Sequence, residues 1–224
     1  RGYRVAVNYS ADSGGANDVV ERIRADGGTA IAIKADVAVE NDVVRLFQEA
    51  DAALGPVTAL VNNAGITGKR TRVDAMEAAD IARVLAVNVT GTILCAREAV
   101  RRMSTAHGGK GGAIVNISSR ASAIGGAGDW VHYAASKGAI DTFTLGLARE
   151  VAGEGIRVNA VSPGLIETSI HAAAGAGDRL ARLAPTVPMK RIGAPEEVAE
   201  AVIWLLSRHS SYIAGAIVPV CGGR

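Results

Sequence analysis

Residues 57–65, VTALVNNAG, run from a short apolar strand into a polar turn, and this stretch decides the fold. Such a strand, without polar alternation, is typical of a sheet that is covered by helices on both faces. Strand-like stretches return at 113–118, AIVNIS, and at 156–161, IRVNAV, with helical stretches in between. This alternation predicts parallel strands joined by helical crossovers.

The same reading extends outward along the chain. Further strands are predicted at 3–8, 29–35 and 216–220, and helices at 15–26, 40–53, 74–104, 131–153 and 195–207. The stretch 74–104 carries either one long helix or two abutting helices. The sequence therefore predicts an α/β fold, a doubly wound parallel sheet of the Rossmann type with helices on both faces. One domain over residues 1–224 suits this length.

Composition excludes several classes of protein. With 24 Lys+Arg against 22 Asp+Glu the formal net charge is +2, too even for a dedicated nucleic-acid binder. An apolar content of 49% argues against disorder, and without about 18 consecutive apolar residues we expect no membrane span. Cys95 and Cys221 are far apart and the histidines lack ligand spacing, so we expect no metal site and a reducing, cytoplasmic setting.

Small or polar residues follow five of the predicted strands. They are Asn8-Tyr9-Ser10, Asp36-Val37, Asn62-Asn63-Ala64-Gly65, Ser118-Ser119 and Ser162-Pro163-Gly164. Turn formation alone explains any single instance. A doubly wound sheet, however, binds its ligand outside the carboxyl ends of its strands. Five such ends together favour a ligand site.

The run YAASK, which begins at Tyr133, places Tyr133 and Lys137 at i and i+4 on one helix face. A lysine cation near a phenol lowers a pKa that is normally about 10, so Tyr133 is a candidate general acid/base. The motif arises easily by chance and is weak by itself. Ser119, with Ser118 as a rival, ends the preceding strand at the same edge, where a hydroxyl can hold a substrate oxygen.

The roles of two neighbours of Tyr133 are left open by the sequence. His132 points about 100° away from Tyr133 on a helix, so it either faces the substrate or has a local role. Trp130 precedes the same helix and either shapes the pocket or only packs.

Together these motifs resemble the short-chain dehydrogenase/reductase family. The resemblance rests on NNAG at 62–65, Asn88 in VNVTG, Ser119, YAASKG at 133–138, IRVNAVSPG at 156–164, and the segments 191–207 and 212–223. These motifs follow one another in the family's order across nearly all of the chain.

The resemblance implies an NAD(P)-dependent oxidoreductase that transfers hydride between a nicotinamide cofactor and a small carbonyl compound or secondary alcohol. It implies that Tyr133 exchanges a proton with the substrate and that Lys137 lowers the phenol pKa. Ser119 would orient the substrate oxygen, and Asn88 would anchor a water in a proton relay. The implied cofactor-binding residues are Tyr133 and Lys137, Asn62, Ala64 and Gly65, Asp36 and Val37 at the adenine, and Pro163, Gly164, Ile166 and Thr168 at the nicotinamide.

The residues after the first strand bear on the choice of cofactor. An acidic residue there would bind a ribose 2′-hydroxyl and repel a 2′-phosphate. Asn8, Tyr9 and Ser10 stand in its place, and Asp12 comes four residues late. NADP is therefore favoured over NAD, with Asn8 and Ser10 among the cofactor-binding residues.

Two departures from the family pattern stand out. The family's first strand and its glycine-rich loop, TGxxxGxG, are absent, and we expect them to precede residue 1 in the intact protein. Ser119 also lies 14 residues before Tyr133, one more than in many relatives, which puts an extra residue into the substrate-facing loop 123–130. The segments 120–131 and 165–190, the second a lid with a mobile stretch at 171–182, are expected to choose the substrate.

The family resemblance implies a homotetramer or dimer that pairs the long helices at 88–104 and 131–153. We expect a small-molecule partner, no nucleic acid and no membrane. The alternative function is a nucleotide-binding scaffold or regulatory protein of the same fold without turnover, since fold alone does not fix function.

Overall fold

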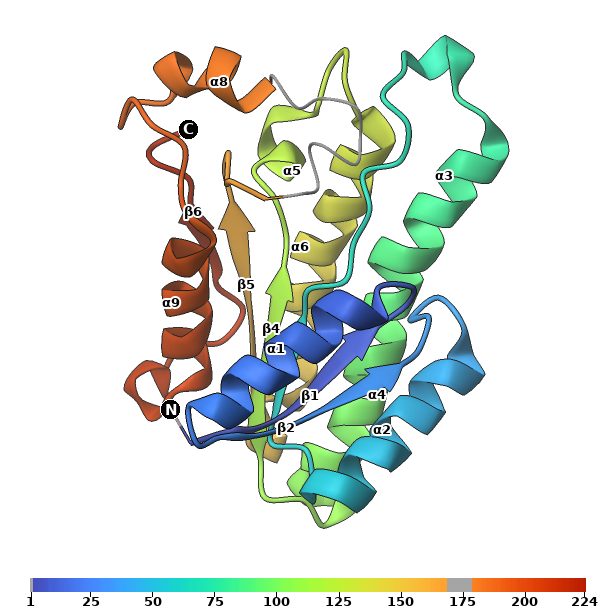
Figure 1. Cartoon of the computed structure of the whole chain (residues 1–224), viewed down its shortest axis with the longest axis vertical. Coiled ribbons are helices and arrows are strands. Elements are labelled where there is room, and N and C mark those ends of the chain that lie inside the picture. Colours follow the sequence, from blue (N-terminus) through green and yellow to red (C-terminus); the bar gives the residue numbers. More distant parts are fainter. Residues whose placement is uncertain (1, 169–178) are drawn as a thin grey trace.

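Strands and helices alternate along the chain (Figure 1) in a computed structural model that describes residues 2–168 and 179–224. The strands are β1 (Arg4–Tyr9), β2 (Thr29–Lys34), β3 (Ala59–Asn62), β4 (Gly112–Ile117), β5 (Ile156–Pro163) and β6 (Ile217–Val220). The helices are α1 (Ser13–Ala25), α2 (Glu40–Leu54), α3 (Ala78–Leu85), α4 (Thr92–Met103), α5 (Ala121–Ile124), α6 (Val131–Val151), α8 (Arg179–Leu183) and α9 (Pro195–Leu206). Outside the 74–104 stretch, the predicted elements are confirmed to within two residues. Residues 169–178, most of the expected mobile stretch and the middle of the expected lid, lie outside the described residues.

Every described strand pair is parallel, as helical crossovers require. β3, β4, β5 and β6 form one sheet in that order, and β1 pairs with β2 in a second sheet. The predicted doubly wound arrangement is confirmed. Among the described strands, however, β1 and β3 do not pair with each other, so the sheet is interrupted between them. Each of these two strands leaves one edge unpaired, and Val61 on β3 is 40% exposed.

The central strands alternate their side chains between two apolar layers, which is the period-two pattern of a sheet covered on both faces. Ile114 on β4 and Val158 on β5 belong to a layer shared with α2, α4 and α6. Val115 and Val161 belong to the opposite layer, against α9. All four side chains are completely buried. The two layers fix β4 and β5, whose carboxyl ends carry the candidate site.

The stretch predicted as one or two helices at 74–104 has an irregular centre. A π-helical turn, Ala86–Gly91, joins α3 to α4, so the backbone stays helical from Ala78 to Met103. Such a turn adds a residue to the helix and is frequent at functional sites. It carries Asn88, which is 1% exposed, and so places a polar amide in the interior.

By length and composition alone, the helical run Ala78–Met103 could cross a membrane, with a mean hydropathy of 1.4 in its most apolar window. Charged and polar residues interrupt this run, so it holds no 18 consecutive apolar residues, and the expected absence of a membrane span stays a prediction. Val84 and Ala99 within the run are completely buried in the fold. Glu98, 3% exposed, is paired with Arg97, Arg101 and Arg102.

Candidate active site

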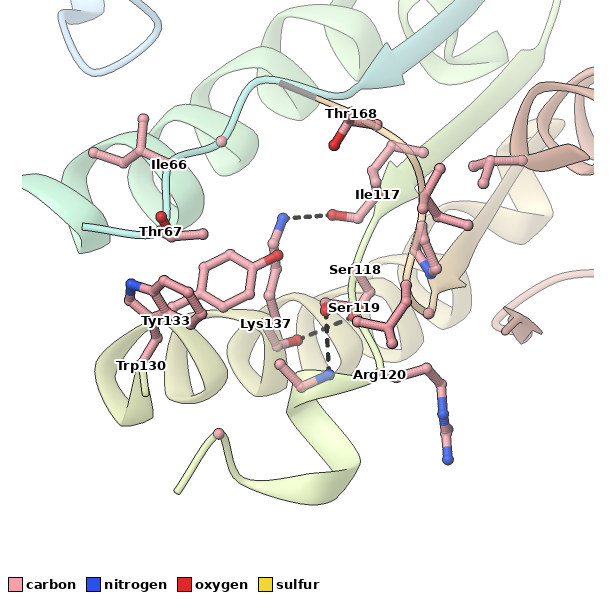
Figure 2. Close-up of a pocket in the computed structure, with 18 of the residues that line it drawn as sticks. Ile66, Thr67, Ile117, Ser118, Ser119, Arg120, Trp130, Tyr133, Lys137 and Thr168 are labelled. Atoms are coloured by element: carbon pink, nitrogen blue, oxygen red, sulfur yellow. Dashed lines mark hydrogen bonds between the residues drawn. The ribbon is translucent and has the colours of Figure 1, made fainter. Parts of the chain in front are cut away.

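The carboxyl ends of β3, β4 and β5 open onto a cavity of about 1180 Å³ (Figure 2). Its walls come from the loop after β3, the end of β4 with α5, the first turns of α6, the loop after β5 and one face of α9. Ligand pockets commonly measure about 300–1,000 Å³. This cavity therefore has room for the reactive end of a cofactor together with a substrate.

Tyr133 and Lys137 stand one turn apart on α6 and both line the cavity (Figure 2). Lys137 is only 5% exposed, and its Nζ donates a hydrogen bond of 2.7 Å to the carbonyl oxygen of Ile117. The same nitrogen lies 5.7 Å from the centroid of the Tyr133 ring. The i, i+4 spacing thus produces the shared helix face that the sequence predicts.

The pKa of Tyr133 lies above its ordinary value, whereas the sequence predicts a pKa below it. Burial raises the pKa of the phenol, and a hydrogen bond with Ser119 lowers it. The Lys137 ammonium group donates to Ile117 and lies beside the ring. Its expected effect on the phenol stays a prediction.

The two serines at the end of β4 have different surroundings. Ser118 is 2% exposed, and its Oγ donates to the carbonyl oxygen of Lys137 at 3.4 Å. Ser119 bonds with the phenol, and its Oγ also accepts the backbone N–H of Ala121 at 3.1 Å. Of the two candidates left open by the sequence, Ser119 is therefore the one that contacts Tyr133.

Burial also acts on Lys137. It lowers the pKa of the ammonium group from 10.5 to about 8, while the nearby Asp141 carboxylate raises it. A buried cation of this kind loses solvation and gives up its proton more readily. Lys137 is thus a cation at neutral pH that titrates just above it.

Asn88 ties the loop after β3 to the helix of Tyr133. Its Oδ1 accepts the backbone N–H of Ile66 and its Nδ2 donates to the carbonyl oxygen of Ile66, both at 2.8 Å. The same Nδ2 donates to Oγ of Ser136 at 3.0 Å, and that hydroxyl donates to the carbonyl oxygen of Tyr133 at 2.7 Å. The π-helical turn therefore holds two walls of the cavity at once.

The structure gathers part of the expected residue set. The expected residues that line the cavity are Gly65, Ser119, Tyr133, Lys137, Pro163, Gly164, Ile166 and Thr168. Asn88 stands behind this wall, bonded to Ile66. The expected residues that do not line it are Asn8, Ser10, Asp36, Val37, Asn62 and Ala64.

Several of these outlying side chains are engaged elsewhere. Nδ2 of Asn62 donates to a buried asparagine of β4 at 2.9 Å, so this side chain faces the interior. Nδ2 of Asn8 donates to the carbonyl oxygens of Ile33 and Ala35 at 3.3 and 3.0 Å. The Asp36 carboxylate accepts from Arg83 at 2.9 Å. Asn8 thus bonds the backbone of the neighbouring strand end, while Asn62 and Asp36 bond other side chains.

Sequence reasoning assigned no site role to several other lining residues. They are Ile66, Thr67, Gly68, Lys69, Arg70, Asp80, Ile117, Val198, Val202 and Arg224, among others. The residues from Ile66 to Arg70 directly continue the NNAG turn, so following that strand end further would have found them. The α9 residues lie in a segment that carries the family resemblance, but only the fold shows that they reach the cavity. Asn63, Arg120 and Leu165, which lie in stretches that the sequence singled out, also line it. In the described part of the chain, no group of three or more His, Cys, Asp or Glu side chains could hold a metal ion.

Comparisons with known proteins place this chain in a class of enzymes. All of residues 1–224 match the protein family described as Enoyl-(Acyl carrier protein) reductase. The chain is 50% identical over 223 residues to the uncharacterized oxidoreductase YgfF of Escherichia coli, covering 100% of this chain and 90% of that protein. Dehydrogenases and reductases are among the other relatives of this chain.

Solved structures agree with this class. One is a blue fluorescent protein from a metagenomic library in complex with NADPH, with a TM-score of 0.89 and 32% identity over 99% of this chain and 87% of that one. Another is a gluconate 5-dehydrogenase from Burkholderia cenocepacia in complex with NADP and tartrate, with a TM-score of 0.86 and 32% identity over 99% and 85%. The site and fold thus define an α/β oxidoreductase. The chain belongs to the short-chain dehydrogenase/reductase family, whose members act on CH–OH and C=O groups.

Proposed function

We propose that this chain is an NADP-dependent oxidoreductase acting on a small carbonyl compound or secondary alcohol, with Tyr133 as the general acid/base. The observation that carries the proposal is the convergence of Tyr133, Ser119 and Lys137 at one large cavity, with Asn88 bonded behind them. When bound, the nicotinamide supplies or accepts the hydride. The protein supplies the position of the substrate and the proton.

The residues present fit a nicotinamide dinucleotide. An ammonium group has three donors, and Lys137 uses one of them on Ile117, so donors remain for ribose hydroxyls. Gly65 brings its backbone close to this group: a Cβ atom there would lie 3.5 Å from Nζ of Lys137, in van der Waals contact. The residues that would hold the nicotinamide end are Pro163, Gly164, Ile166 and Thr168.

The end of β1 favours NADP over NAD. Asp12 is the nearest acidic residue in the sequence after this strand, and its Oδ1 accepts the backbone N–H of Gly15 at 2.9 Å at the start of α1. Among the described residues, Asn8 and Ser10 leave no carboxylate at the strand end to repel a 2′-phosphate. Because Asn8 bonds the neighbouring strand, we assign the phosphate contact to the exposed Ser10. Two similar structures contain NADPH and NADP.

The proton chemistry follows from the surroundings of Tyr133. Burial keeps the phenol protonated at neutral pH, which suits donation to a carbonyl oxygen during reduction. Ser119 bonds with the phenol and orients the same substrate oxygen. The Lys137 ammonium stabilises the phenolate that remains. Asn88 holds Ile66 in place, and the family resemblance adds a water anchored there for a proton relay through Lys137.

We also assign the unpaired edges of β1 and β3 to an additional strand, followed by the family's glycine-rich loop, in the intact protein. The 40% exposure of Val61 on β3 supports this assignment, because a central strand of a parallel sheet is normally covered. An apolar face of α9, with Val198, Val202 and Ile203, lies open to the cavity at the same side. A helix after the loop would cover it.

The assembly that we propose is a homotetramer or dimer in the cytoplasm. Large apolar side chains are exposed on the helices expected at the interfaces, with Ile93 on α4 at 40% and Leu145 on α6 at 41%. Trp204 on α9 is 42% exposed, on the helix next to the last strand. Cys95 and Cys221 are both free, which suits a reducing compartment.

Replacement of Tyr133 by Phe tests the catalytic role. We expect kcat for a panel of small ketones and aldehydes to fall by about 10²–10⁴-fold, the usual contribution of a general acid. NADPH affinity, measured by tryptophan fluorescence, should stay within about twofold because the lost hydroxyl is a proton donor. Full activity in Tyr133→Phe would overturn the mechanism. A parent protein that binds NADPH and reduces nothing in the panel would be a nucleotide-binding scaffold.

A further inference from the structure

A second set of contacts lies beside Tyr133, at the start of α6. Trp130 is 5% exposed, and its indole Nε1–H donates to the carbonyl oxygen of Gly68 at 3.1 Å. His132 is 7% exposed, and its Nε2 lies 3.3 Å from Oδ2 of Asp80, a close polar contact in which neither ring nitrogen meets the geometry of a hydrogen bond. Gly68 follows β3 and Asp80 belongs to α3, so both contacts join the helix of Tyr133 to another wall of the cavity.

Gly68 is where these contacts meet. Its φ is +72°, and a Cβ atom there would lie 2.5 Å from Nε2 of His132 and 2.8 Å from Oδ2 of Asp80. Oδ2 of Asp80 also accepts the backbone N–H of Lys69 at 3.0 Å. The loop backbone therefore crosses directly over the His132–Asp80 pair, in a conformation that favours glycine.

The same two segments are joined again at the rim of the cavity. Nε of Arg70 donates to Oδ1 of Asp129 at 2.6 Å, and the backbone N–H of Thr71 donates to the carbonyl oxygen of Asp129 at 3.2 Å. Residues 68–71 and 129–132 are thus held together by side chains and backbone. We call the contacts of Trp130 and His132 with Gly68 and Asp80 the latch.

The position of Tyr133 gives the latch its importance. Trp130 is the N-cap of α6, and no side chain forms a capping hydrogen bond there, so Tyr133 lies in the first, weakly held turn of the helix. Asn88 fixes the other end of the loop at Ile66. A displacement of about 1 Å at a reacting group costs on the order of 10²-fold in rate.

We propose that Trp130 and His132 are positioning residues, which act through the latch to hold the Tyr133 phenol at the substrate oxygen. The inference rests on the proposed role of Tyr133 as the acid/base. The latch ties the first turn of α6 to the loop after β3 and to α3. Its loss should therefore lower the rate of proton transfer more than the binding of the cofactor.

Two substitutions and two matched controls test the latch. Trp130→Phe removes the indole donor and keeps an aromatic ring, and His132→Leu removes the group that faces Asp80. Tyr212→Phe and His209→Leu remove a polar aromatic group and a histidine at exposed positions. We expect kcat to fall about tenfold in both latch variants, with little change in the NADPH dissociation constant and none in the controls. His132→Gln, which keeps a polar side chain against Asp80, should recover most of the loss.

Hydrogen exchange gives a readout that does not depend on activity. Backbone amides of residues 69–71 and 131–135 should exchange faster in the latch variants than in the parent and control proteins. Faster exchange with an unchanged kcat would overturn the positioning role, and unchanged exchange would overturn the latch itself. A parent protein without turnover would contradict the proposed function, while the exchange rates would still decide whether the latch exists. If His132→Leu does not fold, Asp80→Asn weakens the same contact at constant size.

Discussion

At the residue scale, Tyr133 is subject to two opposing effects. Burial raises the pKa of its phenol and the Ser119 hydrogen bond lowers it, so Ser119 sets how readily the phenolate forms. The ease of phenolate formation affects the two directions of the reaction differently. Reduction of a carbonyl needs the phenol, and oxidation of an alcohol needs the phenolate.

Replacement of Ser119 by Ala should therefore raise the pKa of Tyr133 and affect oxidation more than reduction. We expect alcohol oxidation to fall by about 10–100-fold near neutral pH, the worth of one hydrogen bond to a charged group. Its pH–rate profile should also move to higher pH. Ser118→Ala is the control, because the Ser118 hydroxyl bonds a backbone carbonyl of α6. Equal losses in both variants would contradict this account.

Lys137 links stability to pH. Its pKa is about 8 in the folded protein against 10.5 for an ordinary lysine. Below pH 8 both the folded and unfolded states carry the proton, and the cost of burying it is fully present. Between pH 8 and 10.5 the unfolded state binds more protons, so the free energy of unfolding rises with pH. This residue alone should contribute about 3 kcal/mol to that rise.

Urea denaturation at a series of pH values from 7 to 10.5 measures this link. The free energy of unfolding of the parent, relative to that of Lys137→Met, should increase through this range. A constant difference between the two proteins would show that the ammonium group is not desolvated in the fold.

At the scale of elements, the π-helical turn packs tightly against the end of β2. Gly91 closes this turn, and a Cβ atom there would lie 2.8 Å from Cγ2 of Val37, a side chain that is 8% exposed. Gly91→Ala should therefore destabilise the protein by about 1–3 kcal/mol through overpacking. Gly146→Ala on α6 meets open space and should be neutral or stabilising by up to about 1 kcal/mol. Thermal unfolding of the two variants decides between these outcomes.

The elements were largely predictable from sequence because periodicity and turn residues act locally. Tyr133 and Lys137 share a face since four residues make about one helical turn, and this needs no tertiary information. The partner of Asn88 could not be predicted in this way, because Ile66 lies 22 residues earlier. The pKa of Tyr133 was likewise beyond reach, since it depends on burial and on which side chain faces the phenol.

At the scale of the whole molecule, the residues at the end of β1 should set the choice of cofactor. Ser10→Asp puts a carboxylate where we place the 2′-phosphate, so the dissociation constant of NADPH should rise by at least about tenfold. NADH binding should stay constant or improve. Fluorescence titration measures both, with Ser211→Asp as an exposed control far along the chain. A parent protein that prefers NADH would contradict the assignment.

The division of the sheet shows a further limit of local patterns. Each strand from β1 to β6 carries its own signal, but their pairing order depends on contacts between distant residues. The unpaired edges of β1 and β3 agree with the absence of the family's first strand and glycine-rich loop from this sequence. The strand between them stays a prediction.

The π-helical turn between α3 and α4 has a consequence for the length of the chain. Each residue of a regular helix advances the side chains by about 100°. Removal of one residue between Ala86 and Gly91 could restore regular pitch, but it would rotate Val84 and Ala99 relative to one another about the helix axis. The side-chain amide of Asn88 would then point away from the backbone of Ile66 and lose its two hydrogen bonds. This segment should thus tolerate changes of side chain better than any change in residue number.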